Sequence, residues 1–398
     1  MSNVNDEVKF KVNGFAGAVA EGFLGRPKKE EQFCKDGITT GKTPTPYKRL
    51  NLSITDVNKG VQYLELFGSK NDVIKFRCKY PKASNKEEFE YKVEELDISE
   101  VYGPNGLNEK YAKVATKKYT IQWGAFLEED EEGKNRIKYT NELEFVDTYT
   151  FASVLQKLMP ELMKDGKKFK VISNPRPNRY NGKTSLRYEP LNIREIIKAD
   201  EDMLPHTEVT LPIVCQKGVL DKDFTLAKIA ALPKPDRKFD ISVFAQIWNG
   251  NNQANELVPF ICSIDLSETD EDMLGPVIDV YGELFNKTDT GESLKPKKYY
   301  QGILQMRLVN KTASVEFTES EKKMIKIGMA TEDQLIREKT GKYAKTTSEL
   351  VVYKLKSDGL LSEIDVNEDL NFFIEEHDEV QNTERKLAKD PTSTDFEI

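Results

Sequence analysis

The chain has 398 residues, of which 38% are hydrophobic and 32% are charged, and its formal net charge is −8. This length predicts two or three compact units rather than one. The 20 Phe, 16 Tyr and 2 Trp residues exclude a chain that is disordered throughout, because such chains are poor in aromatic side chains. No run approaches the roughly 18–20 apolar residues that an ordinary membrane-spanning helix needs.

The first half of the chain is rich in predicted strands. They show the apolar–polar alternation of half-buried strands or are bounded by turn residues. They are expected at residues 8–24, 47–55, 61–68, 73–80, 89–98, 119–128, 137–147, 167–173 and 186–196. Hairpin turns are predicted at 56–60 and 128–133, and loops at 25–46 and 174–185.

One clear helix is expected among these strands, at residues 148–164. Its apolar residues recur at helical spacing and form one stripe. Thr148 or Thr150 is the expected N-terminal cap, Pro160 should kink or divide the helix, and Gly166 should end it.

The second half repeats this general order of elements after a predicted boundary at 199–207. Strands are expected at 209–215, 239–248, 256–266, 277–285, 300–309 and in the segment 338–356, and a helical stretch is expected at 318–338. The resulting prediction is a mainly β (α+β) protein with a first domain at 1–198 and a second β-rich domain, a candidate for the same fold, at 205–356.

The end of the chain is acidic. Residues 357–398 contain 13 acidic and 3 basic residues, so residues 1–356 carry a net +2. We expect a largely disordered tail there, with a short helix at 370–380. The tail could compete with nucleic acid for a basic surface and hold partner proteins, or it could only add solubility; the sequence leaves both open.

The sequence carries no recognisable catalytic or metal-binding set. The four Cys and two His residues lack zinc-site spacing, and the Gly-Lys-Thr tripeptides at 41–43 and 182–184 lack the first Gly of a phosphate-binding loop. Asp265, Asp270 and Asp272 are better explained as a solvated loop than as a Mg²⁺ site. We therefore predict no catalytic residue, metal or cofactor, and reduced cysteines in a cytoplasmic protein without a signal peptide.

The strongest positive signal is a basic segment, residues 164–198, with ten basic and three acidic residues. Phosphates attract Lys and Arg, and unstacked bases pack on aromatic rings and guanidinium groups. Two shorter stretches and one Trp show the same mixture. The predicted nucleic-acid-binding residues are Tyr47, Lys48, Arg49, Lys75, Phe76, Arg77, Lys79, Tyr80, Trp123, Lys168, Arg176, Arg179, Tyr180, Lys183, Arg187 and Tyr188. The alternative is that the aromatic residues fill the core and that the charges line a solvated sheet face.

The order of these features resembles a known fold. Strands, a helix at 148–164, the segment Gly166–Val171, a basic tip at Tyr180–Gly182 and a last strand through Leu191–Ile193 are similar to an oligonucleotide/oligosaccharide-binding (OB) barrel, in which the helix lies between the third and fourth strands. Together with the acidic tail, the chain resembles the single-stranded DNA-binding proteins of large bacteriophages and bacteria. The chain ends Asp395-Phe396-Glu397-Ile398, whereas the bacterial tails end Ile-Pro-Phe.

The resemblance implies a single-stranded DNA-binding protein that acts in phage-type DNA replication or recombination, with single-stranded DNA and replication or recombination proteins as partners. The alternative is a non-catalytic structural or assembly protein, such as a virion component or an interaction scaffold. Salt-sensitive binding to oligothymidylate separates the two.

Overall fold

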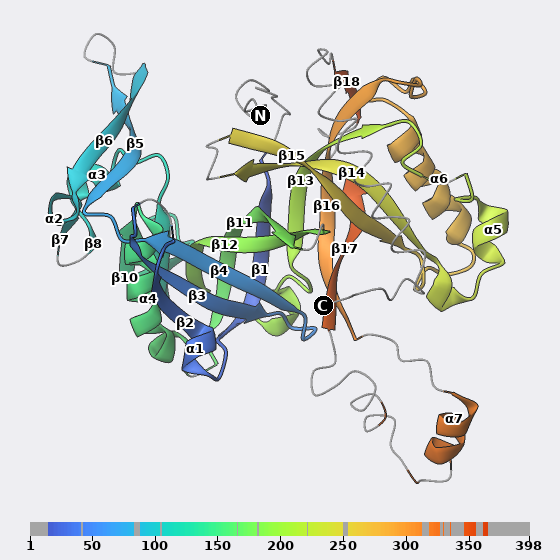
Figure 1. The fold of residues 1–398 in the computed structure, drawn as a ribbon, viewed down its shortest axis with the longest axis horizontal. Coiled ribbons are helices and arrows are strands. Elements are labelled where there is room, and N and C mark those ends of the chain that lie inside the picture. The colour runs from blue at the N-terminus through green and yellow to red at the C-terminus, as the bar shows by residue number, and fades with distance from the viewer. Residues whose placement is uncertain are drawn as a thin grey trace.

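The computed structural model describes residues 15–40, 43–82, 88–103, 106–164, 166–180, 183–220, 222–249, 254–312, 318–326, 346–355 and 361–364, and the single residues 329 and 335. The start of the predicted strand at 8–24 and the predicted tail helix at 370–380 lie outside these residues. Within them the protein is mainly β, as predicted (Figure 1).

Five strands of the first half close into a barrel. They are β1 (Gly17–Gly25), β3 (Pro46–Thr55), β4 (Val61–Ser69), β11 (Lys168–Tyr180) and β12 (Lys183–Ile196). β1 pairs with β3, β3 with β4, β11 with β12 and β11 with β1, all antiparallel, and a parallel pairing of β4 with β12 closes the ring. Helix α4 (Thr148–Leu162) connects the third and fourth barrel strands in chain order. This is OB topology, and the OB-like architecture predicted from the sequence is confirmed.

Helix α4 packs its apolar face on this barrel. Phe151, Leu155 and Met159 are fully buried. The cap is Asp147, whose side chain accepts a hydrogen bond from the Thr150 backbone N–H at 2.8 Å, and not Thr148 or Thr150 as predicted. An ionised carboxylate at this position also interacts favourably with the positive end of the helix dipole. Pro160, expected to kink or divide the helix, does not divide it, because α4 continues through Pro160 to Leu162.

The second half forms a barrel with the same connectivity. Its strands are β13 (Glu208–Gln216), β14 (Lys238–Asn249), β15 (Ala254–Asp265), β16 (Tyr299–Thr312) and β17 (Thr346–Leu355). β13 pairs with β14, β14 with β15, β16 with β17 and β13 with β16, all antiparallel, and β15 meets β17 in parallel. Helix α6 (Leu274–Asn286) again lies between the third and fourth barrel strands.

Helix α6 corrects the sequence prediction of a strand at 277–285. The segment has apolar residues at spacings of three and four, and Leu274, Ile278 and Phe285 are buried on one helix face. The short stretch VIDVY is also rich in β-branched and aromatic residues, which favoured a strand. The helical period covers the longer window and therefore prevails.

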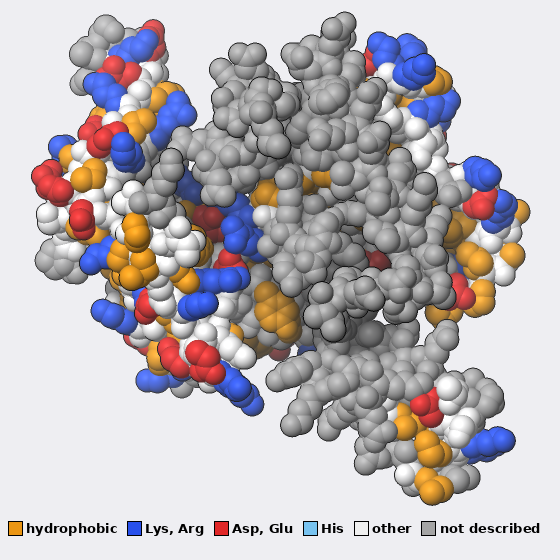
Figure 2. All heavy atoms as spheres, in the orientation of Figure 1, with side chains coloured by type: hydrophobic (Ala, Val, Ile, Leu, Met, Phe, Trp, Pro, Cys, Tyr) orange, Lys and Arg blue, Asp and Glu red, His pale blue; other side chains and the backbone are white. Residues whose placement is uncertain are grey.

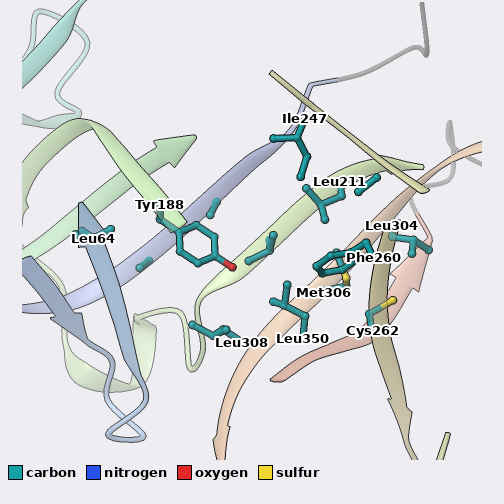
Figure 3. Packing of buried hydrophobic residues seen from close by; sticks show 14 of the residues in the cluster. Leu64, Tyr188, Leu211, Ile247, Phe260, Cys262, Leu304, Met306, Leu308 and Leu350 are labelled. Carbon is teal, nitrogen blue, oxygen red and sulfur yellow. The ribbon is translucent and has the colours of Figure 1, made fainter. Parts of the chain in front are cut away.

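The two barrels are joined through their first strands. β1 and β13 pair antiparallel, with Gly17, Ala18 and Val19 opposite Thr210, Val209 and Glu208. The hydrogen-bonded sheet is therefore continuous between the two domains that were predicted on either side of the boundary at 199–207. The buried residues of both barrels form one hydrophobic cluster. Figure 3 shows Tyr188 beside Leu64 on the side of the first barrel, with Leu211, Leu308 and Phe260 on the side of the second.

A long insertion separates β4 from α4. Its strands β5 (Val73–Pro81) and β6 (Phe89–Asp97) form a separate antiparallel hairpin, hereafter the arm, which projects from the first barrel at the left of Figure 1. A small core packs against one face of the arm, and Phe76 and Tyr111 belong to it. The hairpin of β9 (Tyr119–Glu129) and β10 (Asn135–Phe145) follows, and β9 extends the barrel sheet by pairing in parallel with β12.

Two expected loops contain regular structure. The 25–46 segment includes α1 (Glu30–Phe33) and β2 (Cys34–Ile38), which pairs with β3. The predicted loop at 174–185 continues both β11 and β12 up to the pair Tyr180 and Lys183. Proline has no backbone N–H, so Pro175 and Pro177 donate no hydrogen bond from their edge of β11. The pairing of β11 with β1 ends at Ser173, before both prolines. The prolines therefore cost the β1–β11 pairing no hydrogen bond.

The remaining elements are short. They are α2 (Ile98–Val101), β7 (Tyr102–Gly103), β8 (Gly106–Leu107), α3 (Glu109–Ala112), α5 (Leu226–Ala230), α7 (Glu319–Lys326), β18 (Ser362–Ile364) and 3-10 turns at Asp200–Asp202 and Lys234–Asp236. None of the helices in the described part of the chain is long and apolar enough to cross a membrane.

Candidate nucleic-acid interface

The outer surface of β3 and β4 carries exposed aromatic and basic side chains. Successive strand residues point to opposite faces, so the buried Leu50 and Leu64 turn inward while Tyr47, Arg49, Tyr63 and Phe67 turn outward. Tyr63 is 67% exposed and Phe67 is 44% exposed. The rings of Tyr47 and Phe67 lie together, with centroids 5.3 Å apart.

Strand β12 adds a second arginine to this surface. Arg187 donates from Nη1 to Glu65 Oε1 at 2.7 Å, and Arg49 donates from Nε to Glu65 Oε2 at 2.9 Å. The side chains of both arginines remain about half exposed, whereas Glu65 is largely covered. One carboxylate therefore holds two guanidinium groups beside the exposed rings. We call Tyr47, Arg49, Tyr63, Glu65, Phe67 and Arg187 the barrel face.

The barrel face has the position and the chemistry of a single-strand binding surface. β3 and β4 are the second and third strands of the OB barrel, and that surface binds oligonucleotides in OB proteins. The exposed rings can stack on bases, and the guanidinium groups can pair with phosphates or stack in turn. Figure 2 shows basic and hydrophobic side chains next to each other over this part of the first barrel.

No family model and no curated protein matches this chain.

Three residues of the barrel face were missing from the sequence prediction, namely Tyr63, Glu65 and Phe67. The alternation in VQYLELFG was sufficient to place them on the face opposite Leu64 and Leu66. The hairpin with 47–55 would then have brought them beside Arg49. The search for basic clusters missed them because this strand contains no Lys or Arg.

Lys48 is predicted as a binding residue but points inward. Its Nζ lies 2.7 Å from Asp36 Oδ1 and donates to Gln156 Oε1 of α4 at 2.9 Å. Burial lowers the pKa of this ammonium group, but its hydrogen bonds and charge interactions with Asp36 and Cys34 together outweigh burial, so the pKa is raised overall. Lys48 therefore fastens α4 to the barrel, because strand alternation places it opposite Tyr47 and Arg49.

Three predicted stacking residues are buried, so the core alternative is the correct one for them. Phe76 packs edge-on against Tyr111, with ring centroids 5.4 Å apart. Trp123 donates from its indole N–H to Glu161 Oε1 at 2.8 Å. Tyr188 points into the shared cluster, and burial raises the pKa of its hydroxyl. None of the three presents a free ring face to a base.

Arg176 and Lys168 are held by acidic partners within the protein. Arg176 is buried and donates from Nε to Glu189 Oε2 at 2.8 Å. Burial would raise the pKa of Glu189, but the charges of Lys117 and Arg176 lower it overall. Lys168 lies 2.6 Å from Asp200 Oδ1. For Arg179, Tyr180 and Lys183, only the backbone at the end of the β11–β12 hairpin falls within the described structure.

The other predicted residues lie on the arm. Lys75 forms an ion pair with Glu95 at 2.7 Å. The Arg77 guanidinium lies over the ring of Tyr91, and the Lys79 ammonium lies over the ring of Phe89. Tyr80 belongs to the opposite face of the arm, where its hydroxyl donates to Glu94 Oε1 at 2.8 Å. The exposed residues of the sequence prediction whose side chains are described therefore lie on two surfaces, the barrel face and the arm.

Asp265 and the second Gly-Lys-Thr tripeptide have ordinary structural surroundings in the described part of the chain. Asp265 Oδ1 accepts hydrogen bonds from the Ser267 N–H and hydroxyl groups, and its Oδ2 lies 3.4 Å from Lys238 Nζ. No cluster of three or more metal-ligating side chains occurs among the described residues. In the second Gly-Lys-Thr tripeptide, Lys183 and Thr184 begin a strand, whereas a phosphate cradle opens a helix.

Proposed function

We propose that this chain is a sequence-tolerant, non-catalytic single-stranded DNA-binding protein of the cytoplasm. The first barrel binds the strand on its barrel face. The acidic tail serves replication or recombination proteins of a phage-type system. The barrel topology supports the architecture, and the exposed chemistry of β3, β4 and β12 supports the ligand.

The observation that carries the proposal is the pairing of exposed rings with exposed guanidinium groups. Exposed Tyr63 and Phe67 have no core to fill, and Arg49 and Arg187 are oriented by one carboxylate beside them. Stacking requires bases that are not already stacked and paired, so the barrel face favours single strands over duplexes. Stacking on an aromatic ring accepts any base, because every base has a π-face, which favours sequence tolerance.

The test is a fluorescence-anisotropy titration of labelled oligothymidylate and of a duplex of equal length, at two salt concentrations. We expect single strands to bind more tightly and the affinity to fall with salt. Replacing Arg49 and Arg187 by Gln should reduce the log–log salt slope by about 0.7 for each phosphate that the variant no longer neutralises. The matched control is Lys228→Gln with Lys287→Gln, which removes two positive charges from the second barrel.

Two outcomes contradict the proposal. One is the absence of salt-sensitive binding to single strands at low salt, and the other is an equal loss of affinity in the arginine and the control variants. Either result favours the alternative of a structural or assembly protein, whose exposed rings contact other proteins.

A further inference from the structure

The exposed face of the arm repeats the chemistry of the barrel face. On this face Arg77 lies opposite Val93 and Lys79 lies opposite Tyr91 in the strand register. The Arg77 guanidinium carbon is 4.3 Å from the centroid of the Tyr91 ring, and Lys79 Nζ is 3.9 Å from that of Phe89. Tyr91 is 53% exposed and Phe89 is 44% exposed. Two cations thus lie on two rings that the small core does not use.

The charge on this face changes along the arm. Near the barrel, Lys75 lies opposite Glu95 and the two form an ion pair. Farther out, the register pairs of this face contain Arg77, Lys79, Pro81, Val93, Tyr91 and Phe89, with no carboxylate among them. The outer half of the face is therefore positive and aromatic, which suits a phosphate backbone with unstacked bases and repels a cationic partner.

A groove lies where β4 of the first barrel passes into the arm. Its volume is about 750 Å³, and it is lined by residues 44–46, residues 69–75 and Asp147. Ser69 is the last residue of β4, and Lys75 belongs to β5. The positive charges of Lys70 and Lys75 equal in number the negative charges of Asp72 and Asp147 in its lining. The Asp147 carboxylate also accepts a hydrogen bond from the Tyr102 hydroxyl. A strand that leaves the barrel face at Phe67 would enter this groove before reaching the arm.

We propose that the arm is a second stacking platform for the same strand, so that bound single-stranded nucleic acid runs from the barrel face through the groove onto Arg77, Lys79, Phe89 and Tyr91. This inference rests on the proposed function of the barrel face. It gives the protein a longer binding site than one barrel provides, since a single OB barrel covers roughly 4–16 nucleotides.

The experiment measures affinity against oligothymidylate length for the full chain, for Phe89→Ala with Tyr91→Ala, and for the control Lys228→Gln with Lys287→Gln. For the arm variant we expect unchanged affinity for the shortest oligonucleotide that binds. On long oligonucleotides we expect affinity at least about five-fold lower, the loss that one unstacked base produces. A second variant, Arg77→Gln with Lys79→Gln, should flatten the salt dependence on long oligonucleotides only.

The outcomes separate this inference from the proposed function. If the unaltered chain binds no single strand at low salt, the proposed function fails and the arm inference falls with it. If the unaltered chain binds single strands and both arm variants show the same dependence of affinity on oligonucleotide length, the barrel function stands and the arm inference is wrong. The arm face would then contact a protein. An equal loss at every length, including the shortest, also contradicts a separate platform.

Discussion

Arg187 Nη1 donates to Glu65 Oε1 across 2.7 Å, at the parallel pairing of β12 with β4 that closes the first barrel. The last strand of the barrel therefore supplies a cation to the surface formed by its second and third strands. Arg187 therefore joins the barrel face at the pairing where the barrel closes. Under the proposed function, a nucleic-acid strand on this surface would cross the β4–β12 pairing.

Glu65 limits the positive charge of the barrel face. We expect Glu65→Gln to raise the affinity for oligothymidylate several-fold at low salt and to steepen its salt dependence, because Arg49 and Arg187 lose a competing anion. The stability should change by no more than about 1 kcal/mol, since both arginines are half exposed. The matched control is Glu283→Gln on α6, which removes the same charge far from the site. Weaker binding by Glu65→Gln would show that orientation of the arginines matters more than their charge.

Exposed and buried aromatic residues should respond oppositely to truncation. Tyr63→Ala with Phe67→Ala should weaken single-strand binding by about 1–3 kcal/mol for each base that loses its stacking partner, while the melting temperature stays nearly unchanged. Trp123→Ala should lower the free energy of unfolding by about 3–5 kcal/mol and leave the affinity of the folded protein unaltered. Titration and thermal melting of both variants check this. Unchanged binding by the first variant would remove the barrel face from the site.

Glu21 should make the protein sensitive to acid. This carboxylate on β1 is 1% exposed; burial alone would raise its pKa, but Lys198, the Leu204 N–H and Lys170 lower it below its ordinary value of 4.5. A lowered folded-state pKa stabilises the fold above pH 4.5, and the stabilisation is lost as the pH falls through the folded-state value. Glu21→Gln should therefore be less stable at neutral pH and lose less stability on acidification. Urea unfolding at neutral and acidic pH measures both effects; parallel curves for the two proteins would contradict them.

The position of the cut decides what removal of the acidic tail does. Residues 365–398 contain 11 acidic and 3 basic residues, so cutting after Ile364 removes a net −8. Single-strand affinity should then rise, most at low salt, because screening limits exposed charges to about 8 Å at physiological ionic strength. Cutting after Lys356 also removes the buried Leu361 and strand β18, which pairs with β16, and should lower the melting temperature. Weaker single-strand binding by the protein cut after Ile364 would contradict competition between the tail and nucleic acid.

The sequence was most informative where one period dominates locally. The alternation in 47–55 and 61–68 predicted the β3–β4 hairpin, and the apolar stripe of 148–164 predicted α4. It was least informative where the outcome depends on distant pairing. Nothing near Tyr188 indicates that β12 pairs with β4 at this residue or that its ring joins the hydrophobic cluster of both barrels. Nothing near Arg176 indicates that Glu189 is its partner.

Composition also offered a partial view of the site. The basic count over 164–198 pointed to a hairpin in which Lys168 and Arg176 are held by acidic partners, while Arg187 of the same hairpin reaches the barrel face. The side chains that stay exposed are those on the strand face that lies outside the closed barrel. Which face that is depends on the register of strand pairing and not on the density of charged residues in the sequence. Phe67 and Tyr63 show this, since they belong to a strand without a single basic residue.

The antiparallel ladder of Gly17–Val19 on β1 against 208–210 on β13 has the form of a contact between two copies of one molecule. Each first strand pairs with the other in its leading half and with its own second strand, β3 or β14, farther along. Two one-barrel subunits would make this arrangement as an isologous dimer with twofold symmetry. Because one chain contains both halves, its assembly does not depend on protein concentration, and the melting temperature should be the same in dilute and concentrated solution. Because both halves belong to one chain, their sequences and structures can differ. The first barrel carries the arm between its third strand and its helix, and the second barrel does not.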